Sequence, residues 1–347
     1  MALDPLVTCI VPSFNYAGYI GRALDSAIAQ DYPAELLEIV VVDDGSTDGT
    51  ADVVAAYGER VRYVRKENGG LNSAVDRGIA EAAGELMAIL DADDTWPAGK
   101  VRRQVELLKA RPEVGLVYGD MEVIDSDDRV VQPSFFGMYG LTPARGRILP
   151  TLVRRNVVSG GSAMWRASLR DSYHPIGAQS AFPDWWIAVG IARVAEIECL
   201  PEPANRYRMH GDNMGFGVDD AARLARVQRD RDIPFRRWLL ADLHRAEVAA
   251  ADLVDAYAIL AGSIARTAEA LGEPLEAIAP VTGEARERAA QAAETGMAAL
   301  HAGDLSAAVS SLVAALAINP FEGRAGAALD AVAPLARAAA PPTPFAS

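Results

Sequence analysis

The amino-acid sequence predicts an α/β fold: a mostly parallel sheet flanked by helices, followed by an all-α C-terminal region. Up to about Gly217, short β-rich runs alternate with amphipathic stretches, which is typical of βαβ units. Beyond that point the chain is rich in alanine and has a helical pattern almost throughout. The length of 347 residues also exceeds what one compact domain usually needs. We therefore predict two domains, residues 1–217 and 218–340.

Five β-rich, largely apolar runs are predicted strands, at residues 7–11, 39–42, 61–64, 86–90 and 115–118. Helical patterns lie between them, at residues 20–30, 50–57, 73–83 and 100–110. Strands that alternate with helices form a largely parallel sheet, in which ligands bind beyond the carboxyl ends of the strands. Residues just after each strand are therefore the first candidates for a site.

The composition excludes several classes of protein. With 50% hydrophobic and 23% charged residues, the chain is not mostly disordered. Its formal net charge of -14 gives it no general attraction to nucleic acid or anionic lipid. Two cysteines, Cys9 and Cys199, are too few for a disulfide scaffold. Because we find no signal-peptide pattern and no membrane span, we expect a cytoplasmic protein.

Polar residues follow four of the predicted strands. The four segments are Pro12-Ser13-Phe14-Asn15-Tyr16, Asp43-Asp44-Gly45-Ser46-Thr47-Asp48, Glu67-Asn68-Gly69-Gly70 and Asp91-Ala92-Asp93-Asp94. A strand-to-helix turn, with Ser46 or Thr47 as a helix cap, explains part of the second segment. It explains two adjacent acids poorly, since they repel each other. The other interpretation is a carboxylate that accepts hydrogen bonds from a nucleotide base or ribose.

The acidic segment at residues 91–94 follows a strongly apolar run. Burying its negative charge is costly unless a cation offsets it. Alternating acids can share one divalent ion, which commonly keeps substrate phosphates among its ligands. The alternative is a turn in which Asp93 or Asp94 caps the next helix. We favour a site for Mn²⁺ or Mg²⁺.

Four motifs in this order resemble those of family 2 glycosyltransferases of the GT-A fold. They are Val7-Thr-Cys-Ile-Val-Pro-Ser-Phe-Asn15, Val40-Val-Val-Asp-Asp-Gly-Ser-Thr-Asp48, Asn68-Gly-Gly-Leu-Asn-Ser-Ala-Val-Asp-Arg-Gly78 and Leu90-Asp-Ala-Asp-Asp94. The resemblance covers roughly Leu6 to Gly217. It implies a metal-dependent, inverting hexosyltransferase that uses a nucleotide-diphosphate sugar, with UDP as the expected nucleotide.

The resemblance also implies roles for individual residues. Asp44 would contact the base, and Asp93 would be the direct metal ligand of a DXD motif formed by Asp91 to Asp93. The expected nucleotide-binding residues are Pro12, Ser13, Phe14, Asn15, Asp44, Asn68, Gly69, Asp91 and Asp93. Many relatives have Ala-Arg-Asn where this chain has Ala74-Val75-Asp76, so no polar role of that Arg or Asn is carried over to Val75 or Asp76.

Phe182-Pro183-Asp184-Trp185-Trp186 resembles the Glu-Asp motif of the family, with Asp184 as the catalytic base and Pro183 in place of the usual acid. Trp185 and Trp186 would form a sugar-stacking wall. The alternative is that Asp184 only stabilises the first turn of a helix.

Arg206-Tyr-Arg-Met-His210-Gly-Asp-Asn213 resembles the segment that closes the active site, where His210 would approach the metal and the diphosphate. Gly161, in a glycine-rich segment at residues 156–162, is expected on the acceptor side. A tight turn would use the same residues.

The helical region is predicted from Asp219, with breaks near Pro234, Gly272, Pro280 and Gly303. Residues 290–325 resemble one tetratricopeptide unit, although a generic alanine-rich helical hairpin explains the pattern equally well. A single unit cannot bury its apolar face, so we expect it to pack on the preceding helices or on a second subunit in a homodimer. The tail, residues 341–347, is predicted to be disordered.

The expected acceptor is a hydroxyl of a glycan or lipid-linked glycan. A peptide or protein side chain is the alternative, because some peptide-modifying glycosyltransferases also join a GT-A domain to such helices. A nucleotidyltransferase is disfavoured, since its glycine-rich basic signature is absent at residues 12–15. A non-catalytic scaffold that retains the fold stays open because Val75 and Pro183 depart from the family pattern.

Overall fold

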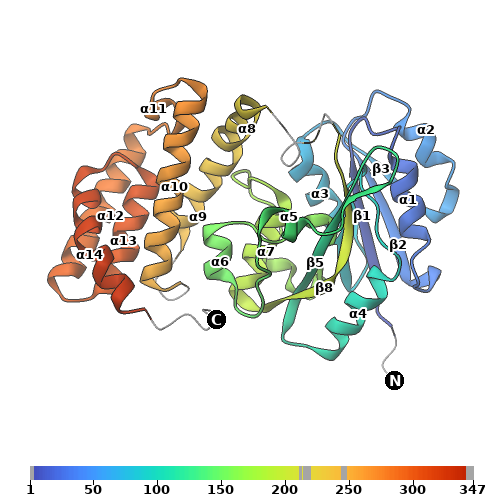
Figure 1. Cartoon of the computed structure of the whole chain (residues 1–347), viewed down its shortest axis with the longest axis horizontal. Coiled ribbons are helices and arrows are strands. Elements are labelled where there is room, and N and C mark those ends of the chain that lie inside the picture. Colours follow the sequence, from blue (N-terminus) through green and yellow to red (C-terminus); the bar gives the residue numbers. More distant parts are fainter. Residues whose placement is uncertain (1–3, 211–212, 214–219, 244–247, 341–347) are drawn as a thin grey trace. The chain divides into compact units, whose positions relative to one another are not determined.

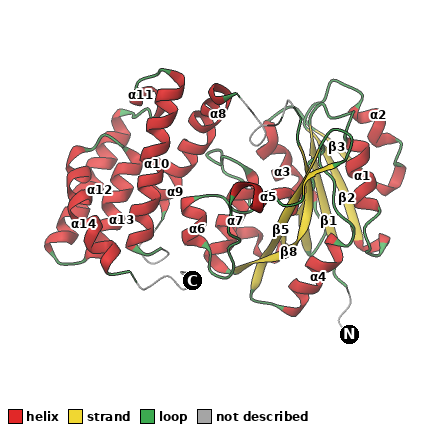
Figure 2. Ribbon diagram, in the orientation of Figure 1, coloured by secondary structure: helices red, strands yellow, loops and turns green. Residues whose placement is uncertain are grey.

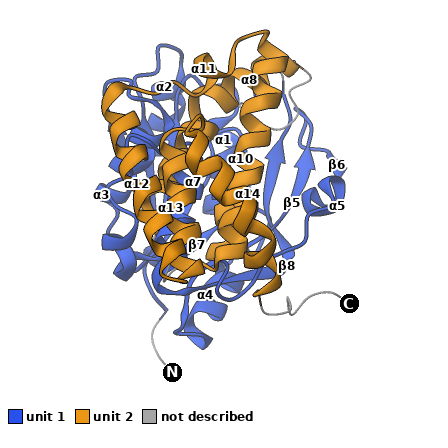
Figure 3. Ribbon diagram, turned by 90° about the vertical axis from the view of Figure 1, so that its left-hand side faces the viewer, with its two compact units in different colours: residues 1–148, 156–217 blue, residues 149–155, 218–347 orange. Residues whose placement is uncertain are grey.

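The computed structural model describes residues 4–210, 213, 220–243 and 248–340. Asp219 and the tail at residues 341–347 lie outside the described residues. The contacts divide the chain into two compact units (Figure 3). Unit 1 comprises residues 1–148 and 156–217, and unit 2 comprises residues 149–155 and 218–347. A domain boundary at residue 217 stays a prediction.

Unit 1 is built on an eight-stranded sheet in the order β3-β2-β1-β4-β7-β5-β6, with β8 paired to β5 (Figure 2). The strands are β1 Val7–Ser13, β2 Leu37–Asp43, β3 Arg62–Arg65, β4 Leu86–Ile89, β5 Val114–Ile124, β6 Val130–Gln132, β7 Met164–Arg166 and β8 Glu196–Arg208. β1 pairs in parallel with β2 and β4, and β5 pairs in parallel with β8. Only β6 and β7, among the described strands, run antiparallel to their neighbours. The predicted α/β class with a mostly parallel sheet is therefore confirmed.

Helices cover both faces of this sheet (Figure 1). They are α1 Ile20–Ile28, α2 Thr50–Ala55, α3 Gly70–Glu81, α4 Lys100–Ala110, α5 Phe135–Tyr139 and α7 Pro183–Val194. Alternate residues of the central strands face opposite sides. Val41 belongs to a core that includes Leu24 of α1 and Val101 of α4, whereas Val40 and Val42 pack with Ala74 of α3. Central strands buried on both faces explain the unbroken apolar runs in the sequence.

The strands β6, β7 and β8 were not predicted. β7 has three residues, which is too short for a periodic signal. β8 has 13 residues but contains Pro201 and Pro203, and its alternation is interrupted by exposed polar positions. Its pairing with β5 shifts register near Gly119 and Asp120, which accommodates these irregular residues. Tertiary pairing thus overrides the weak local preference.

Unit 2 is helical throughout its described residues. Its helices are α6 Leu149–Arg154, α8 Ala221–Val227, α9 Ile233–Asp242, α10 Ala250–Leu271, α11 Leu275–Ile278, α12 Gly283–His301, α13 Leu305–Ile318 and α14 Gly323–Ala338. The apolar helix α13 contacts α9, α10, α12 and α14, so it forms the centre of the unit. In the described part of the chain, no helix combines the length and the apolar character that a bilayer crossing requires.

The predicted break at Gly303 is confirmed, because α12 and α13 are joined by a turn in which Gly303 has φ 81°. Asp304 caps α13 by accepting a hydrogen bond from the Ala307 amide. A Cβ on Gly296 would lie 2.8 Å from the Leu312 side chain, so the two helices cross where only glycine fits. These features describe a close helical hairpin, and its relation to tetratricopeptide units stays a prediction.

The predicted break at Pro234 is wrong. A π-helical turn at residues 228–232 joins α8 to α9, and Pro234 lies in the first turn of α9. Proline lacks the N–H that a helix interior requires, and the wider turn accommodates it without ending the helix. By contrast, α10 ends as predicted at Gly272, which has φ 65°.

We predict that Gly190→Ala lowers the free energy of unfolding of unit 1 by about 2 kcal/mol. A Cβ at Gly190 of α7 would lie 2.2 Å from the Ser172 carbonyl oxygen, and a backbone atom cannot move aside as a side chain can. The matched control is Gly21→Ala in α1, whose Cβ would lie 3.5 Å from the Tyr57 hydroxyl. Denaturant unfolding followed by circular dichroism measures both. Equal stability of the two variants would contradict the close packing of α7.

Candidate active site

The candidate active site lies at the edge of the sheet where β1, β2 and β4 end. Because β1 pairs in parallel with both β2 and β4, the loops that follow these three strands lie at the same edge of the sheet. The Asn15 amide donates to Ser46 Oγ at 2.9 Å, and Asn15 Oδ1 accepts from the Thr47 amide at 2.8 Å. Helix α2 has Gly49 as its N-cap, so neither Ser46 nor Thr47 is the cap. These contacts join the first two motifs into one polar surface.

The adjacent acids Asp43 and Asp44 have separate partners. Asp43 accepts hydrogen bonds from the Ser46 amide and the Tyr63 hydroxyl. Burial opposes ionisation of Asp43, but these hydrogen bonds outweigh it and hold the pKa below its usual range. Asp44 pairs with Lys66 Nζ at 2.6 Å and accepts from the Gly70 amide at 2.7 Å. Repulsion between the acids is therefore offset separately for each, and Lys66 is a partner that the sequence did not indicate.

The predicted nucleotide-binding residues of the first and third motifs differ in exposure. Phe14 is 43% exposed, which leaves its ring available to a planar base. Asn15, Asn68 and Gly69 are exposed as well. Pro12 and Ser13 are buried in β1, and Ser13 Oγ has no hydrogen-bond partner among the described residues. An unpaired buried hydroxyl beside this surface is a group that a polar ligand could satisfy.

The acidic loop after β4 is held by residues from the far end of the domain sequence. Asp93 Oδ2 lies 3.0 Å from His210 Nε2. Asp94 accepts hydrogen bonds from Asn205 Nδ2 at 2.6 Å and from the Arg208 amide at 2.8 Å. Helix α4 has Gly99 as its N-cap and no side-chain cap, so Asp93 and Asp94 do not cap it.

Negative charge is concentrated in this loop. Burial, with the charges of Asp93 and Asp184, raises the pKa of Asp91 to about 7. Burial and the two neighbouring acids also raise the pKa of Asp94 well above its usual range. A Cβ on Gly160 would lie 3.3 Å from the Asp184 side chain and 3.9 Å from the Ile89 side chain, so Asp184 lies near the end of β4, where the acidic loop begins.

The donor set of this loop fits a divalent cation. The 3.0 Å between Asp93 Oδ2 and His210 Nε2 equals, to within precision, the roughly 3 Å between neighbouring ligands of an octahedral ion with bonds of about 2.1 Å. Among the described residues, no group of three or more His, Cys, Asp or Glu side chains is arranged to hold a metal ion. Asp93 and His210 are therefore the two side chains that could hold such an ion, with substrate phosphates supplying further ligands.

Two tyrosines that the sequence analysis did not single out surround His210. The Tyr19 ring stacks on the imidazole with centroids 5.4 Å apart, and Tyr16 meets it edge-on at 6.4 Å. The His210 amide also donates to Asn213 Oδ1 at 2.6 Å. Burial and the nearby Asp93 raise the pKa of Tyr16, so its hydroxyl stays neutral. These contacts orient the imidazole toward Asp93.

Asp184 lies in the first turn of α7, where Phe182 is the N-cap. Asp184 Oδ2 accepts from the Gly160 amide at 3.2 Å, and Oδ1 accepts from the Trp185 amide at 2.7 Å. Burial raises the pKa of Asp184 to about 6, against these hydrogen bonds. A carboxylate with a pKa just below neutral pH is suited to accept a proton.

The residues predicted on the acceptor side lie in different environments. Gly161 is buried, and a Cβ there would lie 2.6 Å from Asn205 Nδ2, so close approach to Asn205 explains this glycine. Trp185 is buried in the core at 2% exposure. Trp186 is partly exposed and donates from its indole nitrogen to the Tyr173 carbonyl at 2.8 Å. Of the two tryptophans, Trp186 therefore has surface for a ligand.

Three side chains in or just before α4 hold the turn that presents Gly160 to Asp184. Trp96 Nε1 donates to the Gly161 carbonyl at 3.0 Å, and Gln104 Nε2 to the Ser162 carbonyl at 2.7 Å. Lys100 Nζ lies 3.3 Å from the Ala163 carbonyl and 3.8 Å from the centroid of the Trp96 ring. Carbonyl and aromatic contacts offset part of the cost of burying this lysine.

Part of the chain matches a known protein family. Residues 8–173 match the model of the family described as Glycosyl transferase family 2. This part of the chain is a glycosyltransferase family 2 domain. It contains the predicted nucleotide-binding residues, whereas Asp184 and His210 lie beyond the matched residues.

Relatives described as uncharacterized glycosyltransferases share the same region. One from Rickettsia felis is 36% identical over 218 residues, which are 60% of this chain and 35% of that protein. Another from Nostoc sp. is 31% identical over 214 residues, which are 60% of this chain and 66% of that protein. The chain thus spans about a third of the first relative and just under two thirds of the second.

Solved structures show the same fold. TarS 1–349 of S. aureus in complex with UDP-GlcNAc has a TM-score of 0.54 at 19% identity, covering 89% of this chain and 90% of that chain. Mannosyltransferase PcManGT from Pyrobaculum calidifontis, in complex with GDP-Man and Mn²⁺, has a TM-score of 0.56 at 23% identity, covering 93% of this chain and 89% of that chain. The predicted GT-A fold class, with a helical C-terminal region, is thereby confirmed.

We predict that Lys100→Met is more stable than the native protein at pH 7 and that the difference shrinks toward pH 10. Burial lowers the pKa of Lys100 to about 7, whereas an unfolded lysine titrates at about 10.4. Between these pH values Lys100 is protonated in the unfolded chain and neutral in the folded protein, so the stability of the native protein rises with pH. This gain in stability is lost as the pH falls through about 7. Urea midpoints at intervals across this range measure the effect.

The control for this experiment is Lys109→Met, at the more exposed end of α4, where Lys109 pairs with Asp4 at 2.7 Å. The difference in stability between Lys109→Met and the native protein is expected to stay constant over the same pH range. If the Lys100 and Lys109 variants showed parallel pH profiles, the lowered pKa of Lys100 would be refuted.

Proposed function

We propose that this chain is an inverting glycosyltransferase that transfers a sugar from a UDP-sugar to an acceptor hydroxyl. The observation that carries the proposal is that Asp184, which accepts from the Gly160 amide, lies near the end of β4, where the acidic loop of the family 2 domain begins. A proton acceptor and a cluster of cation-binding carboxylates are the two parts that displacement of a diphosphate from a sugar requires. The complexes of TarS with UDP-GlcNAc and of PcManGT with GDP-Man support a nucleotide-diphosphate sugar as the donor.

Asp184 is the proposed catalytic base. Its two hydrogen bonds from backbone amides orient the carboxylate, and a pKa of about 6 leaves it ionised at neutral pH. It would take the proton of the acceptor hydroxyl as that oxygen attacks the anomeric carbon. Attack opposite the departing diphosphate inverts the configuration at that carbon, through an oxocarbenium-like transition state.

The proposed cofactor is Mn²⁺ or Mg²⁺, held by Asp93 and His210. When bound, such an ion offsets the negative charge that develops on the diphosphate leaving group. Asp94 is already occupied by Asn205 and Arg208, so it is a less suitable ligand than Asp93. The Mn²⁺ in the PcManGT complex supports a divalent ion in this fold.

The nucleotide-binding surface is proposed to comprise the loops after β1, β2 and β3. The exposed Phe14 ring would stack on the base, and Asp44 would contact the base. Because Asp44 pairs with Lys66 and accepts from the Gly70 amide, its contact with a base would share an oxygen with these donors. We favour uracil from the motif resemblance around Asp44.

The acceptor is proposed to be a glycan or lipid-linked glycan, with a peptide side chain as the alternative. Trp186, two positions after Asp184, is a partly exposed aromatic residue that could contact either class. A homodimer through the C-terminal helices, a cytoplasmic location and a non-catalytic role stay alternatives or predictions. Turnover of UDP-sugar separates the enzyme from the non-catalytic scaffold.

We predict that Asp184→Asn binds UDP as the native protein does but transfers sugar about a hundred- to ten-thousand-fold more slowly. Asparagine keeps an acceptor for the Gly160 amide and loses the basic oxygen. For the native protein, the rate should rise with pH through about 6 and then level, because the base must be ionised. Single-turnover transfer from UDP-sugars measures both. The control is Asp171→Asn, because Asp171 is exposed. Full activity of Asp184→Asn would show that Asp184 is not the catalytic base.

We predict that UDP stabilises the protein against heat only when Mn²⁺ is present. At a ligand concentration a hundred times its dissociation constant, binding adds about 2.7 kcal/mol, or roughly 5–10 °C for a domain of this size. The measurement is a thermal-shift panel of UDP, GDP, dTDP and CMP, each with and without Mn²⁺. Asp93→Ala should lose the metal-dependent shift, and Asp31→Ala, whose side chain is 77% exposed, should keep it.

Each outcome of this panel has a consequence. A metal-dependent shift with GDP alone would replace uracil by guanine in the proposal. A shift with UDP that does not need Mn²⁺ would contradict the assignment of Asp93. The absence of a shift with any nucleotide would favour the non-catalytic scaffold.

A further inference from the structure

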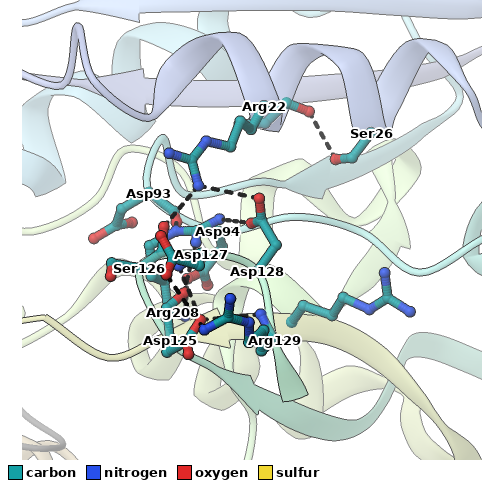
Figure 4. A network of polar contacts seen from close by, with 12 residues as sticks. Arg22, Ser26, Asp93, Asp94, Asp125, Ser126, Asp127, Asp128, Arg129 and Arg208 are labelled. Atoms are coloured by element: carbon teal, nitrogen blue, oxygen red, sulfur yellow. Dashed lines mark hydrogen bonds and ion pairs between the residues drawn. The ribbon is translucent and has the colours of Figure 1, made fainter. Parts of the chain in front are cut away.

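A buried arginine connects the acidic loop to a turn between β5 and β6 (Figure 4). The side chain of Arg208, at the end of β8, is 1% exposed. Its Nε donates to the Asp93 carbonyl at 2.7 Å, and its Nη1 donates to the Asp125 carbonyl at 2.8 Å. Its Nη2 pairs with the Asp128 carboxylate. Arg208 thus holds the peptide of the predicted metal ligand and the β5–β6 turn at the same time.

The turn itself is shaped to present the Asp128 carboxylate. Asp125 Oδ1 accepts from the amides of Asp127 and Arg129 at 2.8 and 3.0 Å. Asp128 has φ 66°, a conformation that aspartate and asparagine adopt more readily than most residues. Its second oxygen accepts from Arg22 Nη1 of α1 at 3.0 Å. Asp128 therefore bridges two arginines, one buried and one exposed.

Arg208 also acts on the other predicted metal ligand. It precedes His210 by two residues, and its guanidinium lies 5.2 Å from the centroid of the Tyr19 ring. Tyr19 in turn stacks on the His210 imidazole. The Arg208 carbonyl accepts from Asn213 Nδ2 at 2.9 Å, which ties the segment on both sides of His210. A change in the position of Arg208 would therefore move both Asp93 and His210.

We propose that Asp128 is a positioning residue, which acts through Arg208 to hold Asp93 and His210 at the spacing that a divalent cation requires. The inference rests on the proposed function, because it takes Asp93 and His210 as metal ligands. A buried guanidinium that loses its carboxylate partner must find another acceptor or become solvated, and either change displaces the Asp93 peptide. Groups that orient metal ligands in this way typically change metal affinity about 10- to 100-fold when they are altered.

The chain offers a matched control one residue away. Asp127 lies in the same turn, but its side chain is 66% exposed and its carboxylate lies 3.6 Å from the exposed Arg129. Asp127→Asn removes the same charge from the same turn without affecting Arg208. Asp128→Asn is the test variant, because asparagine matches aspartate in shape and adopts the same left-handed conformation.

The experiment is a titration of the full chain with Mn²⁺ in the presence of UDP, followed by calorimetry. We expect Asp128→Asn to weaken Mn²⁺ binding about tenfold or more, and Asp127→Asn to bind within about twofold of the native protein. Denaturant unfolding of each variant is measured in parallel. A purely structural role would lower stability and leave the Mn²⁺ dissociation constant of the folded protein unchanged, which would overturn the inference.

The outcomes separate this inference from the proposed function. Native protein that binds no Mn²⁺ would overturn the metal assignment and the inference together. Native binding with an unchanged Asp128→Asn affinity would overturn the inference alone. If Asp128→Asn does not fold, Arg22→Gln is the second test variant. It removes the ion pair between Asp128 and Arg22, whose side chain is 42% exposed. This variant should weaken Mn²⁺ binding by a few fold, and unchanged affinity would again overturn the inference.

Discussion

The site depends on the contacts that stabilise the negatively charged carboxylates at the end of β4. Three acids in four positions follow a buried apolar strand, so their carboxylates must be hydrogen-bonded, paired or protonated. Asn205, Arg208 and His210 supply partners for Asp93 and Asp94, and all three lie in or just after β8. The long pairing of β8 with β5 therefore has a consequence beyond the sheet, because it delivers the groups that make the acidic loop stable.

The aspartates of the candidate site show how the environment of a side chain changes its pKa. Asp43 is held ionised by hydrogen bonds, whereas Asp91 and Asp184 have pKa values raised to about 7 and about 6 by burial. Hydrogen-bond donors and opposite charges stabilise the ionised form, and desolvation stabilises the neutral form. Carboxylates with such different proton affinities within one edge of a sheet allow binding and proton transfer to be divided among them.

Local sequence was a reliable guide where one element forms its own pattern. The predicted helix at residues 100–110 matches α4 residue for residue, and the strands at the centre of the sheet have the apolar runs that two covered faces require. Local sequence did not predict the elements whose structure depends on contacts with distant parts of the chain. β7 is too short to carry a signal, β8 is interrupted by prolines, and the helix continues past Pro234 through a π-helical turn. Lys66 lies outside the quoted motifs and Arg208 was given no role within its segment. Only their contacts with Asp44 and Asp93 distinguish them.

The sequence by itself determined the α/β class, the polar ends of the strands and the motifs that lead to the family 2 domain. These follow from periodicity and from residue types at fixed local spacing, which do not need the rest of the chain. Only the tertiary structure decided which carboxylates meet. Asp93 and His210 are 117 positions apart, and their 3.0 Å contact depends on β8 pairing with β5 and on Arg208 bridging the acidic loop to the β5–β6 turn. The motif resemblance implied that both residues approach one metal ion. The contact itself is set by the packing of the whole unit, which no local pattern of residues encodes.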